Sequence, residues 1–217
     1  MRIGLVGVGH LGKIHLRCLL KTKFIVEGFF DTNQEVSDQI ATEYNVKAFR
    51  DFDSMLDAVD CIDIVSPTVF HFEIAKKAII KGKHIFIEKP LTETTEQARE
   101  LVSLAIKYNV IVQVGHVERY NPAIRSMSGV KFNPKFIEGH RLAMFNPRGT
   151  DVSVVLDLMI HDLDIILSLI KSEVKNVSAN GVCIVSNTPD ICNARIEFVN
   201  GSVANLTASR ISLKNMR

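Results

Sequence analysis

The residues best suited to chemistry form a polar stripe in an apolar segment. From Leu156 to Ile170 the chain is apolar except for Asp157, His161, Asp162, Asp164 and Ser168. At about 100° per helical residue, all of these except Asp162 share an arc of roughly 60°, which predicts a buried helix with one polar face. A histidine between carboxylates can act as a general acid or base, because a neighbouring carboxylate orients its ring and raises its pKa. The alternative is a structural hydrogen-bond network between domains.

A glycine-rich turn near the N-terminus predicts a dinucleotide site. The sequence Gly7-Val8-Gly9-His10-Leu11-Gly12 follows an apolar strand-like run and opens a helical pattern. Such glycines allow a tight turn, close approach of a pyrophosphate and close packing of helix on strand. Asp31 ends the second predicted strand, where its carboxylate can accept hydrogen bonds from the hydroxyls of a ribose. The alternative role of Asp31 is to cap the N-terminus of the next helix. No Lys or Arg occurs from Thr32 to Val46, which favours NAD over NADP, although NADP stays possible.

Two further predicted strands end in polar residues. Ser66-Pro67-Thr68 and then His71 follow one strand, and Glu88-Lys89-Pro90 ends the next. Ligands of open α/β sheets bind outside the carboxyl ends of the strands. Lys89 can therefore direct an ammonium at the nicotinamide end, or it is a solvated loop lysine; His71 either starts a helix or takes part in the chemistry. The predicted cofactor-binding residues are Gly7, Gly9, His10, Leu11, Gly12, Asp31, Ser66, Pro67, Thr68, His71, Glu88, Lys89 and Pro90.

The elements that must position these residues alternate between strand and helix in the first 115 residues. This alternation predicts a doubly wound α/β sheet, and several strands are continuous apolar runs typical of parallel strands covered on both faces. The predicted strands are Arg2–Val6, Ile25–Phe30, Lys47–Phe49, Cys61–Ser66, His84–Glu88 and Val110–Val114. The predicted helices are His10–Lys21, Gln34–Tyr44, Phe70–Lys81 and Glu96–Tyr108, the last with a capping box formed by Thr94 and Gln97.

The pattern changes after Asn121-Pro122, which predicts domains at residues 1–121 and 122–217. The second contains a strand-like Phe136–Phe145 and the apolar segment Val154–Ile170. Asn200-Gly201 indicates a hairpin with a two-residue loop, and the residues before it alternate between apolar and charged. We expect a sheet-dominated α+β domain that is incomplete at its C-terminus.

The composition excludes several classes of protein. The chain has 217 residues, 47% hydrophobic and 23% charged, and a formal net charge of +2. This is a globular composition without an electrostatic reason to bind nucleic acid or an anionic membrane, and no apolar run reaches the roughly 18 residues of a membrane span. The four cysteines form no CxxC pair, so we expect reduced thiols, a cytoplasmic protein and no metal site.

Five motifs in this order resemble the glucose–fructose oxidoreductase/inositol dehydrogenase/rhizopine-catabolism (Gfo/Idh/MocA) family. They are GVGHLG at 7–12 with His15, Asp31, Ser66-Pro67-Thr68 with His71, EKPL at 88–91, and Asp157 with His161. The resemblance extends from Met1 to Arg217. It implies a Rossmann domain followed by an α/β domain whose open sheet forms dimer or tetramer contacts. It also implies reversible hydride transfer between NAD(P) and a sugar or polyol, with Lys89, Asp157 and His161 as catalytic residues.

Within the family, residues 115–122 and 151–164 resemble members that oxidise carbon 3 of a nucleotide sugar such as UDP-N-acetylglucosamine. Arg119, Arg141 and Arg148 could then contact a diphosphate, since arginine pairs with phosphate through two hydrogen bonds; the alternative for each is a surface ion pair. The predicted substrate-binding residues are Arg119, Asn121, Arg148 and Asp164. Because family members are longer, the resemblance also implies that part of the second domain is missing. The alternative function is a non-catalytic NAD-binding sensor or scaffold of the same fold.

Overall fold

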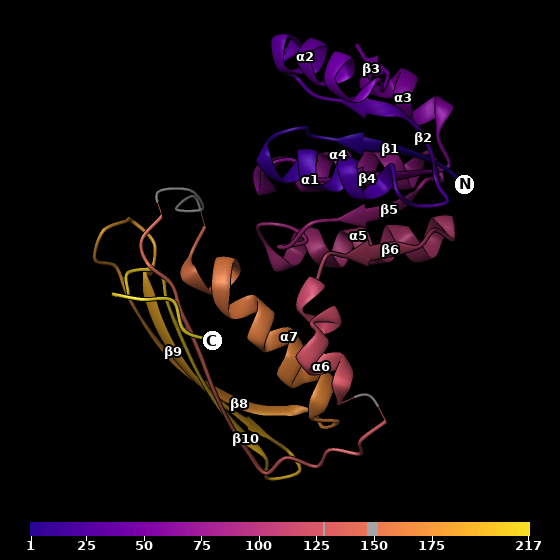
Figure 1. Cartoon of the computed structure of the whole chain (residues 1–217). Helices are drawn as coiled ribbons and strands as arrows, with labels where there is room; N and C mark the ends of the chain where they lie inside the picture. The colour runs from indigo at the N-terminus through magenta and orange to yellow at the C-terminus, as the bar shows by residue number, and fades with distance from the viewer. Residues whose placement is uncertain (128, 147–151) are drawn as a thin grey trace. The chain divides into compact units, whose positions relative to one another are not determined.

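The computed structural model describes residues 1–127, 129–146 and 152–217, which fold into two compact units (Figure 1). These units are Met1–Gly115 and His116–Arg217. The predicted boundary follows Asn121, whereas the structure groups the short 3-10 helix η2 (Val117–Tyr120) with the second unit. Arg119 of η2 also pairs with Asp164 of the same unit.

The first unit is built on a parallel sheet of six strands in the order β3-β2-β1-β4-β5-β6. The strands are β1 (Arg2–Val6), β2 (Ile25–Phe30), β3 (Ala48–Phe49), β4 (Cys61–Ile64), β5 (His84–Ile87) and β6 (Val112–Val114). This order confirms the doubly wound sheet, and the strand sequence changes direction between β1 and β4. Ligands of such sheets bind at that switch point, beyond the carboxyl ends of the strands.

Helices cover both faces of this sheet, as the two hydrophobic cores show. Side chains of α1 and α2 pack into one core with Ile3 and Leu5 of β1, and side chains of α3, α4 and α5 pack into the other with Val6. Successive residues of a strand point to opposite faces, so β1 contributes to both cores. The helices are α1 (His10–Leu19), α2 (Gln34–Tyr44), α3 (Phe52–Ala58), the 3-10 turn η1 (Thr68–Phe70), α4 (His71–Ile80) and α5 (Thr95–Tyr108).

The helix α3 was not predicted from the sequence, because its seven residues are too few to show a helical repeat. Its start is nevertheless capped, since the Asp51 carboxylate accepts from the Ser54 amide at 2.8 Å. The side chains of Met55 and Leu56 on this helix are buried in the core beside the sheet. The capping box at the start of α5 is confirmed, with Thr94 and Gln97 bonded to each other's backbone amide.

The second unit contains a mixed sheet in the order β7-β10-β9-β8. Strands β8, β9 and β10 are antiparallel neighbours, whereas β7 runs parallel to β10. Its elements after η2 are α6 (Pro122–Ser126), β7 (Phe136–Leu142), η3 (Val155–Met159), α7 (Ile160–Leu169), β8 (Val174–Val182), β9 (Ile191–Phe198) and β10 (Val203–Ser209). The expected sheet-dominated α+β architecture is therefore present.

The hairpin between β9 and β10 is confirmed, but its loop is longer than the predicted two residues. The Phe198 amide donates to Ser202 at 2.9 Å, so Val199, Asn200 and Gly201 form the loop. Gly201 has φ +81°, a conformation that glycine adopts readily because it has no Cβ. Its amide donates to the Phe198 carbonyl oxygen at 3.0 Å. Strand β9 alternates as predicted, with Ile196 buried and Arg195 exposed.

The predicted polar-stripe helix forms, with two differences from expectation. Its first part, η3, is a π-helix, so the rotation of about 100° per residue applies only from Ile160 onwards. The helix is also not buried all round: Met159 and Ile166 are buried against the sheet core, whereas most other residues from Val155 to Leu169 stay partly exposed. The reason is that the sheet covers one face of a helix only.

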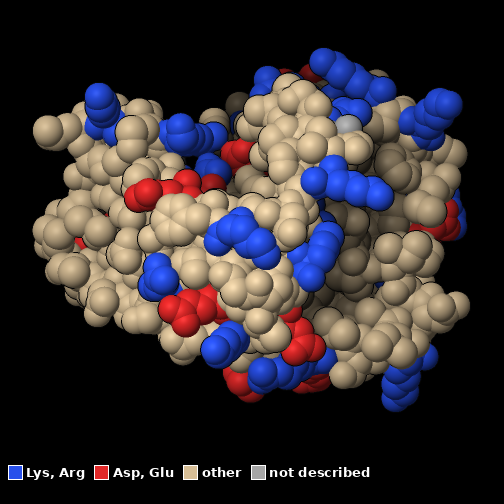
Figure 2. Space-filling model, turned by 90° about the horizontal axis from the view of Figure 1, so that it is seen from below, with Lys and Arg blue, Asp and Glu red and all other residues tan. Residues whose placement is uncertain are grey.

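Lysine and arginine side chains are scattered among acidic and uncharged ones on the face drawn in Figure 2, in line with the near-zero net charge. Among the described residues, no helix is long and apolar enough to cross a membrane. The same residues hold no cluster of three His, Cys, Asp or Glu side chains that could bind a metal ion.

Candidate active site

The glycine-rich turn joins β1 to α1 in a conformation that Gly7 and Gly12 make possible. Gly7 has φ +90°, and a Cβ there would lie 3.0 Å from the Ser66 amide nitrogen. A Cβ on Gly12 would lie 2.0 Å from the Gly7 carbonyl oxygen, so only glycine allows α1 to pack this closely. A Cβ on Gly9 would meet nothing within 4 Å. The space beside Gly9, at the start of α1, is therefore open, and the start of a helix can bind a pyrophosphate.

Asp31 lies just beyond β2 and holds this turn in place. One carboxylate oxygen accepts from the Val8 amide at 2.8 Å, and the other accepts from the Asn33 amide at 2.9 Å. Asn33, rather than Asp31, is the N-cap of α2. Each carboxylate oxygen has a second lone pair, so Asp31 can still accept from the hydroxyls of a ribose beside the glycine-rich turn.

The described groups at the strand ends fit a dinucleotide. The Ser66 hydroxyl is buried and has no hydrogen-bond partner among the described residues, as expected of a group that bonds to a ligand. His71 is buried at the start of α4, with its ring nitrogens 2.9 Å from the carbonyl oxygens of Pro90 and Ser66. It thus joins the turn after β4 to the turn after β5.

Strands β4 and β5 end earlier than predicted, at Ile64 and Ile87. Ser66 and Glu88 therefore lie beyond the last strand residue, in the turns that border the ligand side of the sheet. The carboxylate of Glu88 accepts from the Lys89 amide at 3.1 Å. The backbone of Lys89 is thus held two residues after the end of β5.

We predict that Asp31→Ala weakens NAD binding by roughly 10- to 100-fold, because it removes charged acceptors of ribose hydrogen bonds. NADP binding should fall less, since a 2′-phosphate would gain from loss of the carboxylate. Titration of both cofactors measures this, with Asp38→Ala on the exposed surface of α2 as the control. Tighter binding of NADP than of NAD to the unaltered protein would contradict the assignment of Asp31.

In the second unit, Asp157 lies in the π-helical turn η3 and His161 in the first turn of α7, on one continuous helical segment. A π-turn inside a helix is rare and often marks a functional site. Both residues are partly exposed. Asp162, predicted to lie off the polar face, faces β7, where Arg141 forms two hydrogen bonds to it at 2.9 and 2.7 Å.

Two of the predicted substrate-binding residues bind each other. Arg119 donates to both oxygens of Asp164 at 2.6 Å, and 53% of its side chain stays exposed. Asn121 caps α6 by accepting from the Ala123 amide, and its amide group donates to Glu118 at 3.1 Å. Arg148 lies outside the described residues. The structure thus brings Arg119, Asn121 and Asp164 into one part of the second unit.

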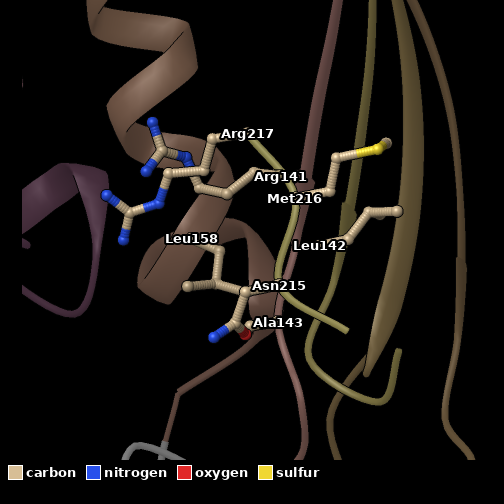
Figure 3. Close-up of a pocket in the computed structure, with 7 residues that line it drawn as sticks. All are labelled: Arg141, Leu142, Ala143, Leu158, Asn215, Met216 and Arg217. Atoms are coloured by element: carbon tan, nitrogen blue, oxygen red, sulfur yellow. The ribbon is translucent and has the colours of Figure 1, made fainter. Parts of the chain in front are cut away.

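A pocket of about 300 Å³ lies between β7 and the segment Asn215–Arg217 (Figure 3). Arg141 borders it, but the guanidinium of Arg141 is engaged by Asp162 and by Glu118 at 3.4 Å. Its described lining includes Leu158 but neither Asp157 nor His161. The predicted catalytic residues of the second unit therefore do not line this pocket.

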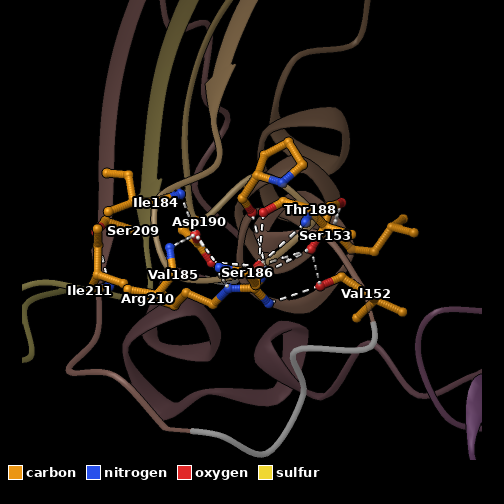
Figure 4. Close-up of polar contacts among 12 residues, drawn as sticks. Val152, Ser153, Ile184, Val185, Ser186, Thr188, Asp190, Ser209, Arg210 and Ile211 are labelled. Carbon is orange, nitrogen blue, oxygen red and sulfur yellow. Dashed lines mark hydrogen bonds and ion pairs between the residues drawn. The ribbon is translucent and has the colours of Figure 1, made fainter.

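A buried ion pair that sequence reasoning missed secures the start of the η3–α7 segment (Figure 4). Asp190, fully buried, accepts from the amides of residues 184–186 and from Arg210 at 2.9 Å. Burial alone would raise the pKa of Asp190, but the amide donors and Arg210 hold this pKa well below its ordinary value. Arg210 in turn donates to the Val152 carbonyl at 2.8 Å, three residues before η3 begins. The sequence carries no local signal for this pair, whose members are 20 residues apart.

Two family descriptions together match nearly the whole chain. Residues 1–116 match an oxidoreductase family with an NAD-binding Rossmann fold, and residues 124–216 match the GFO/IDH/MocA C-terminal domain. The chain is 41% identical over 212 residues to the UDP-N-acetylglucosamine 3-dehydrogenase of Acidithiobacillus ferrooxidans, which covers 97% of this chain and 67% of that protein. A solved structure of that enzyme superimposes with a TM-score of 0.95 over all of this chain and 72% of its own.

A second relative is the scyllo-inositol 2-dehydrogenase (NAD(+)) of Bacillus subtilis, 28% identical over 236 residues, with 98% of this chain and 68% of that protein covered. The chain thus spans about two thirds of the length of these relatives. The relatives are dehydrogenases, and they give no support to a non-catalytic sensor or scaffold. The glycine-rich turn, Asp31 and both matches lead to one conclusion: this chain belongs to the Gfo/Idh/MocA family of oxidoreductases and carries its NAD-binding Rossmann domain.

Proposed function

We propose that this protein oxidises a hydroxyl of a nucleotide sugar, at carbon 3 of UDP-N-acetylglucosamine or of a close analogue. The observation that supports this substrate most is the 41% identity, over 97% of the chain, to the Acidithiobacillus ferrooxidans UDP-N-acetylglucosamine 3-dehydrogenase. The second relative acts on an inositol and shares 28% identity. The higher identity favours the nucleotide sugar over a polyol.

The first unit holds the cofactor in this proposal. The amides at the start of α1 bind the pyrophosphate, and Asp31 accepts the ribose hydroxyls. The Ser66 hydroxyl, buried without a partner among the described residues, bonds to the same ligand, together with residues 67–68 of its turn. His10, Leu11 and Pro90 border this site, and His71 fixes the turns after β4 and β5. When bound, NAD supplies the hydride acceptor for oxidation of an alcohol.

Three residues carry the proposed chemistry. His161 takes the proton of the substrate hydroxyl, because an imidazole titrates near neutral pH and can both accept and return a proton. Lys89 donates a hydrogen bond from its ammonium to the same oxygen and stabilises the negative charge that develops there. Asp157 accepts from a neighbouring sugar hydroxyl or orients the imidazole. General acid–base assistance of this kind contributes roughly 10²- to 10⁴-fold in rate.

Arg119, Asn121, Asp164 and Arg148 are the proposed substrate-binding residues. Arg119 is suited to a diphosphate because a guanidinium carries five N–H donors, of which two are engaged by Asp164. The ion pair with Asp164 holds the remaining donors in a defined orientation. We also propose that the sheet of the second unit takes part in a homo-oligomer, since every residue of its edge strand β8 is exposed.

The proposed function is tested by incubating the protein with NAD and single sugars and following NADH absorbance. UDP-N-acetylglucosamine should be oxidised faster than UDP-glucose or free N-acetylglucosamine. The matched control is UDP-N-acetylglucosamine without its 3-hydroxyl, which should give no NADH. Reduction of the product with borodeuteride should place deuterium at carbon 3. Oxidation of inositols with no reaction of any UDP-sugar would overturn the proposed substrate and leave the family assignment intact.

A further inference from the structure

A largely buried histidine of the first unit lies between two carboxylates. His15, on α1, has its Nδ1 2.9 Å from Asp63 Oδ2, on β4. Its Nε2 is 3.3 Å from Glu88 Oε1, just after β5. The three side chains are 16%, 5% and 10% exposed, and the Phe86 ring lies 6.0 Å from the imidazole. The cluster therefore joins one helix and two strand ends that are distant in sequence.

The geometry identifies the ionic state of this histidine. A neutral imidazole has one N–H and can donate to only one of two carboxylates, whereas an imidazolium donates to both. Burial by itself lowers the pKa of His15, but the hydrogen bonds and charges of Asp63 and Glu88 outweigh it and raise that pKa to about 10. In return, His15 lowers the pKa of Glu88 despite burial of that carboxyl group, whereas at Asp63 burial outweighs His15 and the pKa is raised. The two contacts together therefore indicate an imidazolium at neutral pH.

Glu88 connects this charge to the turn that carries Lys89. Its Oε1 faces His15, and its Oε2 accepts from the Lys89 amide at 3.1 Å. Gly115 closes the other side, because a Cβ there would lie 2.8 Å from Glu88 Oε1. On the far side of the turn, His71 holds the Pro90 carbonyl at 2.9 Å. The backbone around Lys89 is therefore fixed at the residue before it and at the residue after it.

We propose that His15 is a positioning residue for Lys89: its imidazolium holds the Glu88 carboxylate in the orientation that sets the Lys89 backbone. This inference rests on the proposed function, in which Lys89 contacts the substrate oxygen. Without His15, Glu88 and Asp63 are two buried carboxylates that have lost the cation they share, and like charges at such sites take up a proton or separate. Either response removes the constraint on the Lys89 amide.

The charge of His15 is measured first, without reference to catalysis. In the full chain labelled with ¹⁵N-histidine, NMR at about pH 8 should show one ring with both nitrogens protonated, assigned by its loss in His15→Gln. Because the ordinary pKa of histidine is 6.5 and that of folded His15 is about 10, the folded state holds the extra proton between these values. The free energy of unfolding should therefore fall as pH rises through this interval, and less so in His15→Gln. A His15 ring that titrates near its ordinary pKa would overturn the proposal.

Kinetics then test whether His15 acts through Lys89. His15→Gln and Glu88→Gln should each lower kcat by roughly 10- to 100-fold, since small displacements of a catalytic group have effects of this size. In His15→Gln, NAD affinity should change by less than about threefold, because His15 is not among the residues predicted to bind the cofactor. Arg2→Gln is the matched control: it breaks the Arg2–Asp60 pair between β1 and the residue before β4, away from Lys89, and should leave kcat unchanged.

The decisive measurement is a double-mutant cycle with Lys89. In the Lys89→Met background, His15→Gln should cause no further loss of kcat, because its effect requires the ammonium. A further loss equal to that in the unaltered protein would assign His15 a structural role only and overturn the proposal. If His15→Gln does not fold, the nearly isosteric Glu88→Gln carries the same cycle. Full activity of Lys89→Met alone would instead refute the role of Lys89 in the proposed function, and the NMR result would still stand.

Discussion

His161→Ala should lower kcat by roughly 10²- to 10⁴-fold while leaving the affinity for NAD almost unchanged. Oxidation of an alcohol requires the hydroxyl proton to leave as the carbonyl forms, and the imidazole is the group proposed to take it. His161 belongs to the second unit, whereas the glycine-rich turn and Asp31 belong to the first, so cofactor affinity should not depend on this ring. Because the interaction is made mainly in the transition state, kcat and kcat/KM should fall together.

Steady-state kinetics with UDP-N-acetylglucosamine, together with titration of NAD, measure this result. His140→Ala is the control, because His140 is an exposed histidine of the same unit that pairs with Glu138 on β7. It should retain full activity. Near-normal kcat in His161→Ala, at a pH where the unaltered protein is fully active, would place His161 in a structural network. Lys89 or a bound water would then have to be the base.

Lys89→Met should lower kcat by roughly 10²- to 10³-fold, the loss typical of removing one donor to a developing oxyanion. Substrate affinity should also fall, because the ammonium is proposed to contact the reacting oxygen in the ground state as well. Lys89→Arg keeps the charge but changes its geometry, so it should recover only part of the activity. Lys81→Met is the control, because it removes an exposed lysine at the end of α4 that pairs with Asp57. This variant should leave kcat and KM unchanged. A variant at Lys89 that raises KM with kcat unchanged would assign this lysine to uniform binding of substrate.

Much of the first unit could be predicted from the sequence, because its signals are local. The glycine-rich turn needs φ +90° at Gly7 and a missing Cβ at Gly12, and both requirements act between neighbouring residues. The capping box of α5 likewise depends on residues three apart. Where a signal is short, prediction failed: α3 has too few residues to show a repeat, and Val199 extended the hairpin loop beyond Asn200-Gly201.

The polar stripe marks where local reasoning ends. Spacing alone placed Asp157 and His161 on one side of a helix and separated Asp162 from them, but it could not name the partner of any stripe residue. The structure pairs Asp162 with Arg141 and Asp164 with Arg119, across 21 and 45 residues of sequence. The π-turn at η3 also lay beyond the prediction, since residue spacing does not distinguish π from α geometry over five residues.

The sequence by itself determined the order of the elements, the turn that receives the dinucleotide and the residue types available for hydride chemistry. Only the tertiary structure decided what His15 and Asp190 do. His15 meets Asp63 across 48 residues because β4 pairs beside β1, and Asp190 meets Arg210 because β9 and β10 are in register. The physical reason is that periodicity reports which face of an element a side chain occupies, whereas the ionic state of a buried group depends on the charges that strand order brings against it.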